Sequence, residues 1–155
     1  ITTVVGGVNG VALAYDHLVD LENGPDMGNC PVSALAGYLV NAKTRKYLRK
    51  TERSMSLPET WVGGDRPLLG YRAGVSNILP GNLEKGSSGA VCSSVLYSAD
   101  WSNLVIGIYG GGVDLTVDRI TLAAEGKVRI TAALLVGVGV AQPAAFAKMD
   151  DAIIA

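Results

Sequence analysis

A serine-rich turn holds the residues whose types come closest to catalytic chemistry. Gly86-Ser87-Ser88-Gly89-Ala90 sets serine hydroxyls between two glycines, and such a hydroxyl becomes a nucleophile when a nearby general base takes its proton. The chain has a single histidine, His17, in the helix-like run Asp16-His17-Leu18-Val19-Asp20. The catalytic hypothesis is therefore a small serine hydrolase that uses Ser88 and His17.

The context of Ser88 favours a structural turn over catalysis. The turn echoes the nucleophile turn of trypsin-like proteases, and Val4-Val5-Gly6-Gly7 echoes their activated N-terminus. Those enzymes, however, carry their histidine in a loop at a strand end, and this chain has too few strand-like runs for two barrels. A glycine- and serine-rich loop between strands explains the motif without chemistry. We therefore predict no catalytic residues and no enzymatic activity.

Residues that could hold a metal ion or a cofactor are few and wrongly spaced. Cys30 and Cys92 fit neither a zinc pattern nor a disulfide scaffold, and one histidine adds little to them. The N-terminal glycines do not follow G-x-G-x-x-G, and no phosphate-loop lysine comes after them. The sequence predicts no metal, no cofactor and two plain core thiols in a reducing compartment.

The composition indicates a surface that neighbours cover. The 155 residues are 48% hydrophobic and only 17% charged, against a usual charged share of about 25%. Few charges remain to cover the surface of a monomer, so the chain is expected to associate or to be a piece of a larger protein. The net charge of −1 argues against nucleic-acid binding by bulk electrostatics. The longest apolar run, 132–141, is about half of the roughly 20 residues that span a bilayer.

The first half of the chain predicts helices laid on a sheet, an α+β arrangement. We expect a helix from Tyr15 to Glu22, stopped by Asn23-Gly24-Pro25-Asp26, and a buried strand over 34–40. Asn41 then caps a helix from Ala42 to about Arg53. One side of that helix is basic and is interpreted as a solvated face: Lys43, Arg45, Lys46, Arg49, Lys50 and Arg53. The other side is less polar: Thr44, Tyr47, Leu48 and Thr51.

The second half of the chain predicts further strands and a short closing helix. A loop over 54–67, held by Trp61, leads to a strand or two within 68–79 and a strand over 90–97. Near the C-terminus, Pro143 ends a long apolar run, and a helix from Ala144 to Met149 follows. Phe146, in that helix, is expected to anchor in the core.

A glycine triplet is expected at the centre of a long β-hairpin. Alternating patterns predict strands over 104–109 and 113–118, and Gly110-Gly111-Gly112 between them is expected to allow a sharp change of direction. The chain is expected to turn near Glu125-Gly126 and to return along 128–140. No residue from Asp100 to Asp118 is expected to do acid-base or nucleophilic work, so the role of that stretch is interpreted as architectural.

Several of these stretches together resemble the major capsid proteins of tailed bacteriophages, which have the Hong Kong 97-type shell fold. Each stretch is weak alone, but their order and spacing over residues 34–149 make the resemblance specific. The matching pieces are Tyr38–Arg45, Leu69-Gly70-Tyr71, Val75-Ser76-Asn77, Leu79-Pro80, Asp100-Trp101-Ser102, Ile106-Gly107, Gly111-Gly112, Val117-Asp118 and Val138–Ala147 with its Pro143-Ala144-Ala145-Phe146 ending.

The resemblance implies a wedge-shaped shell subunit that forms pentamers and hexamers around phage DNA. It implies that residues 1–110 and 141–155 form the axial domain and that 111–140 form a projecting β-hairpin arm of the peripheral domain. The family's N-terminal arm, extended loop and spine helix have no counterpart here, so the chain is expected to be the C-terminal half of a capsid protein. The implied partners are other copies of the chain, and the implied location is the virion, after synthesis in the host cytoplasm.

The chain departs from the family in its last long strand. The family carries charged or polar residues before the Pro-x-x-Phe ending, where this chain has Gly137, Gly139 and Ala141. An inter-subunit salt bridge at these positions is therefore not expected. Beside the capsid and the hydrolase, a peptide- or ligand-binding module stands as a third hypothesis.

Overall fold

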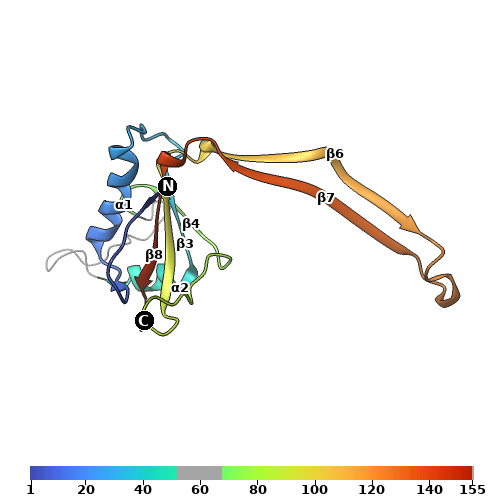
Figure 1. Cartoon of the computed structure of the whole chain (residues 1–155), viewed down its shortest axis with the longest axis horizontal. Helices are drawn as coiled ribbons and strands as arrows, with labels where there is room; N and C mark the ends of the chain where they lie inside the picture. The colour runs from blue at the N-terminus through green and yellow to red at the C-terminus, as the bar shows by residue number, and fades with distance from the viewer. Residues whose placement is uncertain (52–67, 155) are drawn as a thin grey trace. The chain divides into compact units, whose positions relative to one another are not determined.

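The computed structural model describes residues 1–51 and 68–154, which divide into two compact units (Figure 1). The sheet unit comprises Ile1–Asn103 and Gln142–Ala155, and the hairpin unit comprises Leu104–Ala141. Strand pairing in the hairpin unit begins at Leu104, opposite Val140. Trp61 and Arg53 lie outside the described residues.

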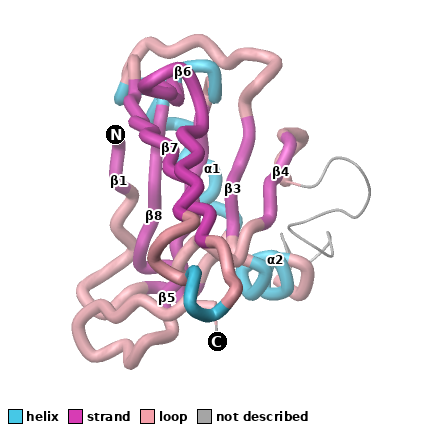
Figure 2. Tube along the Cα trace, turned by 90° about the vertical axis from the view of Figure 1, so that its right-hand side faces the viewer, coloured by secondary structure: helices cyan, strands magenta, loops and turns pink. Residues whose placement is uncertain are grey.

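The sheet unit is built on a mixed sheet whose strands follow the order β1-β8-β5-β3-β4, with β2 also paired to β8 (Figure 2). Its elements are β1 (Thr2–Thr3), β2 (Val11–Ala12), α1 (Tyr15–Met27), β3 (Gly37–Val40), α2 (Ala42–Leu48), β4 (Arg72–Val75), β5 (Cys92–Ser98), η1 (Trp101–Asn103), η3 (Pro143–Ala145) and β8 (Phe146–Ile153). β5 runs antiparallel to both β3 and β8. The predicted α+β fold, with a central sheet and helices beside it, is confirmed.

The first helix is longer than predicted and runs through the residues expected to stop it. α1 continues to Met27 although it contains Gly24 and Pro25, both of which are buried. A Cβ atom on Gly24 would lie 3.0 Å from the side chain of Thr2 and 3.3 Å from Ala147, so a glycine lets α1 lie close to β1 and β8. The helix ends at Met27, and Asn29 shortly after it has a left-handed φ of 53°, a conformation that asparagine adopts at helix ends. Tertiary packing thus overrides the local stop signal.

The second helix begins as predicted and ends early. The Asn41 side chain accepts a hydrogen bond from the backbone N–H of Lys43 at 2.9 Å, which confirms the predicted cap. α2 ends at Leu48, before the predicted end near Arg53, and the N–H of Lys50 then bonds to the Tyr47 carbonyl three residues back, as in a 3-10 turn. The predicted two sides are confirmed up to residue 50: Thr44 and Leu48 are buried and the basic side chains are exposed.

The closing segment is a strand, and the predicted closing helix is wrong. A 3-10 turn, η3, is followed by β8, in which Ala147 and Met149 face the core while Lys148 and Asp150 are half-buried on the opposite face. Ala, Lys and Met favour helices locally. Here β8 fills the place between β5 and the N-terminal strands, so long-range pairing decides its conformation. Phe146 is nonetheless the predicted anchor: it is 8% exposed and packs edge-on against Trp101, with ring centres 5.7 Å apart.

An aromatic cluster fills the space between α1 and the sheet. The rings of Tyr38 and Tyr97 lie 4.8 Å apart, and Tyr71 packs against Tyr97 at 5.7 Å. The Tyr38 hydroxyl donates to Glu22 and contacts the Leu18 carbonyl, which fixes α1 to β3. Burial raises the pKa of Tyr38, and the hydrogen bond to Glu22 raises it further. Burial also raises the pKa of Glu22, which the Tyr38 hydrogen bond only partly offsets.

The hairpin unit is one antiparallel pair, β6 (Leu104–Asp118) with β7 (Arg129–Val140), joined by a turn that contains η2 (Ala123–Glu125). The predicted return strand and turn position are confirmed. The two runs expected on either side of Gly110–Gly112 form a single strand, and the three glycines, all with left-handed φ, form a bulge inside it. Residues 110–113 stand opposite Leu134 alone, between the pairs Tyr109–Leu135 and Asp114–Ala133.

Candidate functional site

The residues of the catalytic hypothesis serve structural roles. His17 Nδ1 accepts a hydrogen bond from the backbone N–H of Ala14 at 3.1 Å, as the third residue of a helix often does at its start. Ser88 Oγ accepts from the N–H of Lys85 at 2.9 Å and contacts the buried thiol of Cys92. No hydrogen bond joins Ser88 to His17 in the part of the chain that the structure describes. Both cysteines are buried and free, as predicted.

A buried carboxylate ties the N-terminal segment to the last strand. Asp151 Oδ2 accepts from the N–H groups of Gly6 and Gly7 at 2.9 and 3.4 Å and pairs with Lys85 Nζ at 2.6 Å. The Asp151 side chain is 3% exposed. Burial alone would raise its pKa, but the hydrogen bonds from Lys85 and Gly6 outweigh burial and hold the pKa of Asp151 below its usual range. The contact with Gly6 joins residues 145 positions apart and the contact with Lys85 joins residues 66 apart, which is why the sequence did not reveal them.

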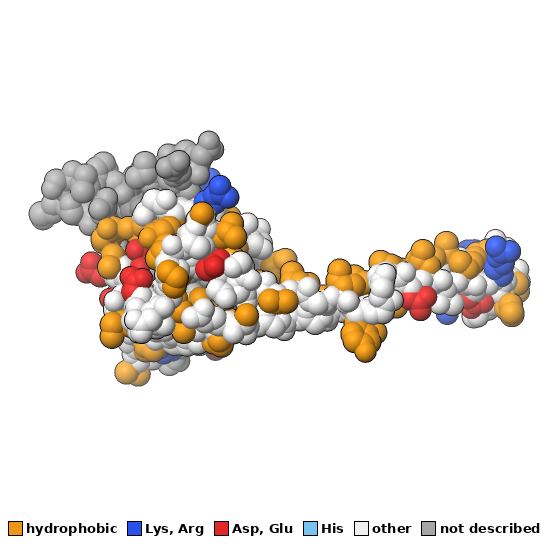
Figure 3. Space-filling model, turned by 90° about the horizontal axis from the view of Figure 1, so that it is seen from above, with side chains coloured by type: hydrophobic (Ala, Val, Ile, Leu, Met, Phe, Trp, Pro, Cys, Tyr) orange, Lys and Arg blue, Asp and Glu red, His pale blue; other side chains and the backbone are white. Residues whose placement is uncertain are grey.

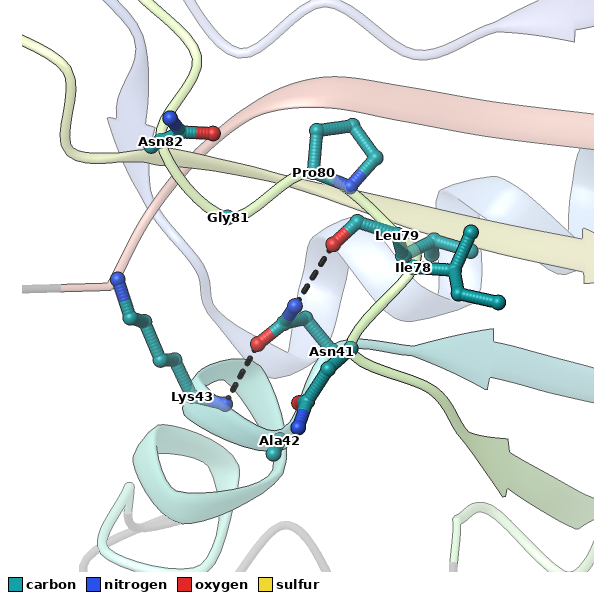
Figure 4. Close-up of a pocket in the computed structure, with 9 residues that line it drawn as sticks. Asn41, Ala42, Lys43, Ile78, Leu79, Pro80, Gly81 and Asn82 are labelled. Carbon is teal, nitrogen blue, oxygen red and sulfur yellow. Dashed lines mark hydrogen bonds between the residues drawn. The ribbon is translucent and has the colours of Figure 1, made fainter. Parts of the chain in front are cut away.

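A pocket of the sheet unit lies at the start of α2 (Figure 4). Its volume is about 710 Å³, and it lies between the start of α2 and the loop over 77–82. Asn41 holds the two sides together, since its Nδ2 donates to the Leu79 carbonyl at 2.7 Å while its Oδ1 caps α2. Ile78 on the loop is almost fully exposed. The buried amide of Asn41, which lines this pocket, is thus already hydrogen-bonded within the fold.

Among the described residues, no three His, Cys, Asp or Glu side chains gather in a way that could hold a metal ion. Within the same residues, no helix is long and apolar enough to cross a membrane.

The hairpin unit carries a continuous apolar face, and the glycine bulge makes that face possible. Successive strand residues point to opposite sides, so a shift by an odd number of residues exchanges the two faces. At the bulge, four residues of β6 stand opposite one residue of β7, so β6 contains three extra residues. Because three is odd, the β6 residues on this face have even numbers before the bulge and odd numbers after it. The resulting face, here called the apolar face, comprises Leu104, Ile106, Ile108, Leu115, Val117, Ile130, Ala132, Leu134, Val136, Val138 and Val140.

The opposite face of the hairpin carries fewer apolar side chains and more polar ones. Its half nearest residues 104 and 140 pairs Gly107 with Gly137 and Val105 with Gly139, and beside the bulge it carries the exposed pair Tyr109 and Leu135. Its other half carries Asp114, Thr116, Asp118, Ala133, Thr131 and Arg129. The hydrophobic side chains run along the hairpin, and the charged ones gather toward its turn (Figure 3).

The apolar face has no cover inside its own unit. Leu115 is 63% exposed and Ile130 is 67% exposed, and every residue of β7 is exposed. Soluble monomers seldom expose contiguous apolar patches beyond a few hundred Å², so a face of this length is characteristic of a surface that binds another protein element. The chemistry that the hairpin unit offers is therefore recognition by burial of apolar area.

Comparison with known proteins gives one family and a set of related folds. The family model described as the phage capsid family matches residues 2–151. The capsid of an empty GTA particle, computed with C5 symmetry, is 21% identical with a TM-score of 0.69, over 97% of this chain and 49% of that chain. No curated protein matches the chain.

Two phage structures also have this fold, with lower TM-scores. A chain of Mycobacterium phage Che8 is 18% identical with a TM-score of 0.62, over 97% of this chain and 53% of that one. A chain of Mycobacterium phage Ogopogo is 20% identical with a TM-score of 0.55, over 93% of this chain and 54% of that one. At these identities the likeness shows the fold, and this chain spans about half the length of each of these solved chains.

Proposed function

Because this chain belongs to the phage capsid family, we propose that it is a structural part of a major capsid subunit that self-associates into an icosahedral shell around DNA. The observation that carries the proposal is the exposed apolar face of the hairpin unit. Hydrophobic burial yields roughly 25 cal/mol per Å² of apolar area, so covering a face of this length strongly favours association. The same exposure explains why the chain tolerates so small a share of charged residues.

The two units are proposed to have different places in the shell. The sheet unit corresponds to the axial domain near the capsomer axis, and the hairpin unit corresponds to the β-arm of the peripheral domain. The GTA capsid, which this fold resembles, was computed with C5 symmetry, a property of that particle that supports a ring-forming role here. The proposal places the protein in the virion, made in the host cytoplasm, with pentamers and hexamers of the subunit as its partners and without an active site.

The apolar face is proposed to pack against another copy of this chain. An isolated two-stranded hairpin is marginal in water unless its apolar face is covered. In the complete family subunit the resemblance places the spine helix there. For the chain as it stands, a second copy brings an equally long apolar surface of the same kind.

A proteolysis experiment tests this association. A glutamate-specific protease should cut after Glu125, in the turn of the hairpin, and the cleavage rate should fall as protein concentration rises. The reason is that a second copy orders and shields the hairpin. Ile130→Asp places a charge on the apolar face and should remove the concentration dependence. Thr131→Asp adds the same charge on the opposite face and serves as the matched control.

Two outcomes would contradict the proposal. If the turn resists cleavage as well as the sheet unit does in dilute solution, the hairpin is a self-contained fold that needs no partner. If cleavage is fast and independent of concentration for the wild-type protein, the apolar face does not bind another copy. Stoichiometric labelling of Ser88 by a fluorophosphonate, lost in His17→Ala, would instead support the hydrolase hypothesis.

A further inference from the structure

Two helices of the sheet unit present opposite charges to solvent. The acidic surface, defined as Asp16, Asp20 and Asp26, lies on the exposed side of α1. Asp and Glu side chains gather on the side of the unit where α1 lies (Figure 3). Two exposed apolar side chains, Val19 and Met27, lie on the same side of the helix and give this surface an apolar component.

The basic surface is defined as Lys43, Lys46 and Lys50, on α2 and directly after it. All three side chains are exposed, and together with Tyr47 and Ile154 they line a pocket of about 320 Å³. The pocket thus combines three ammonium groups with the partly buried side chains of Tyr47 and Ile154. α1 and α2 lie at different places on the unit (Figure 1), so the two surfaces are separate.

Neither surface is neutralised by the described parts of its own chain. The ion pairs of residues 1–51 and 68–154 involve Lys85, Lys127 and Lys148 and none of the six residues that define the two surfaces. Asp16 and Asp20 are one helical turn apart, as are Lys43 and Lys46, and like charges at this spacing repel. Asp26 likewise contributes to the raised pKa of Glu22. Each surface therefore gains from a partner of opposite charge.

We infer that the acidic surface of one copy binds the basic surface of the next copy, so that subunits join head to tail. The inference rests on the proposed self-association and names the contact that the sheet unit makes. Charges spaced by one turn on both helices allow carboxylates and ammonium groups to pair in register. An interface between two different surfaces of identical chains generates a ring when its rotation closes. Such a ring of sheet units matches the axial position proposed above.

Charge-reversal variants of either surface test the pairing between the acidic and the basic surface. Asp16→Lys with Asp20→Lys makes both surfaces basic, and Lys43→Glu with Lys46→Glu makes both acidic. Each double variant alone should self-associate on the order of tenfold more weakly in sedimentation equilibrium, because like charges then meet at the interface. The two double variants mixed together should recover association, since opposite charges face each other again. The quadruple variant should also recover it.

A cross-linking measurement identifies the contact directly. A carbodiimide condenses a carboxylate with an ammonium group, with loss of water, only where the two touch. In an equal mixture of copies labelled with ¹⁴N and ¹⁵N, we expect a peptide that joins Asp16 or Asp20 of one label to Lys43 or Lys46 of the other. Asp114 and Lys127 of the hairpin unit serve as exposed comparison residues that should not join the two surfaces.

The outcomes separate this inference from the proposed function. Association that is equally strong in the wild type and in all charge-reversed variants contradicts the pairing and leaves the proposed self-association intact. A wild-type protein that stays monomeric throughout contradicts both. If Lys43→Glu with Lys46→Glu abolishes binding to duplex DNA without changing self-association, the basic surface is a nucleic-acid site and the inference is wrong.

Discussion

The strands β5 and β6 have similar β-strand propensities but differ in burial. In β5, six of the seven residues are buried, whereas in β6 all residues except Gly112 and Asp118 are exposed. Both strands contain the β-branched and apolar residues that suit a pleated surface. β5 lies between β3 and β8, under a face that α1 covers, and β6 has β7 as its neighbour within the hairpin unit. Strand formation and burial are therefore decided separately in this chain.

The difference determines where stability resides. In the sheet unit, apolar side chains from the N-terminal segment, α1, α2 and five strands share one core, so its folding free energy is internal. In the hairpin unit, the apolar face becomes a source of stability only when another surface covers it. The sheet unit should therefore respond to mutation as a folded monomer does, and the hairpin unit should respond mainly through association.

The largest effect is expected at Phe146 in the sheet unit. Phe146→Ala should lower the free energy of unfolding by about 3 to 5 kcal/mol, the usual cost of removing a large buried aromatic ring. Its edge-on contact with Trp101 makes tryptophan fluorescence during urea unfolding a direct measurement. A loss below about 1 kcal/mol would show that the ring does not anchor the sheet unit, and it would weaken the contrast with the hairpin.

A smaller loss of folding free energy is expected when Asp151, which binds the N-terminal segment, is replaced. Asp151→Asn should cost about 1 to 3 kcal/mol, because the hydrogen bonds from Lys85 and Gly6 lose their charged acceptor. The more exposed Asp150→Asn is the matched control and should cost less.

The same carboxylate predicts a pH dependence. The pKa of Asp151 is lower in the folded than in the unfolded chain, so its contribution is present above the ordinary aspartate pKa of 3.8 and is lost as pH falls below it. Acid unfolding of the wild type should be steeper below about pH 4 than that of Asp151→Asn. Identical acid unfolding curves for the two proteins would contradict this assignment.

The glycine bulge offers a matched pair of substitutions within the hairpin unit. Gly111 has a φ of 79°, which other residues adopt only with strain, so Gly111→Val should cost the hairpin about 1 to 2 kcal/mol. Amide hydrogen exchange in β6 and β7 should then be on the order of tenfold faster. Gly107→Val is the control, because a side chain there meets only the Gly137 carbonyl oxygen, at 3.9 Å. Equal exchange in both variants would show that the bulge does not set the register.

The smallest effect on folding is expected on the apolar face. Leu115→Ala should change the free energy of unfolding of the dilute monomer by less than about 0.5 kcal/mol, since this side chain is already in water. The same substitution should weaken self-association measured by sedimentation. A folding loss comparable to that of Phe146→Ala would mean that the hairpin buries this face within its own chain, and the comparison between the two units would fail.

Features that depend on neighbouring residues could be predicted from the sequence alone. The Asn41 cap, the exposed basic side of α2, the turn near Glu125 and the return strand of the hairpin all follow from local patterns, and the structure confirms them. Capping, periodicity and turn formation act within a few residues, so a single sequence contains the information they need. The order of several weak motifs also carried the family resemblance.

Other features depend on residues far away in the sequence and were seen only in the folded structure. Residues 144–149 look helical, but 144–145 complete η3 and 146–149 begin β8, because β5 and the N-terminal strands leave a place for a strand. α1 runs through Pro25 because packing against β1 and β8 outweighs the local cost of a proline. The even-to-odd change of the apolar positions in β6 was visible in the sequence, but only pairing with β7 showed that the glycine bulge restores one continuous face. Long-range pairing fixes these features because a strand completes its backbone hydrogen bonds only with a neighbour that can lie far away in sequence.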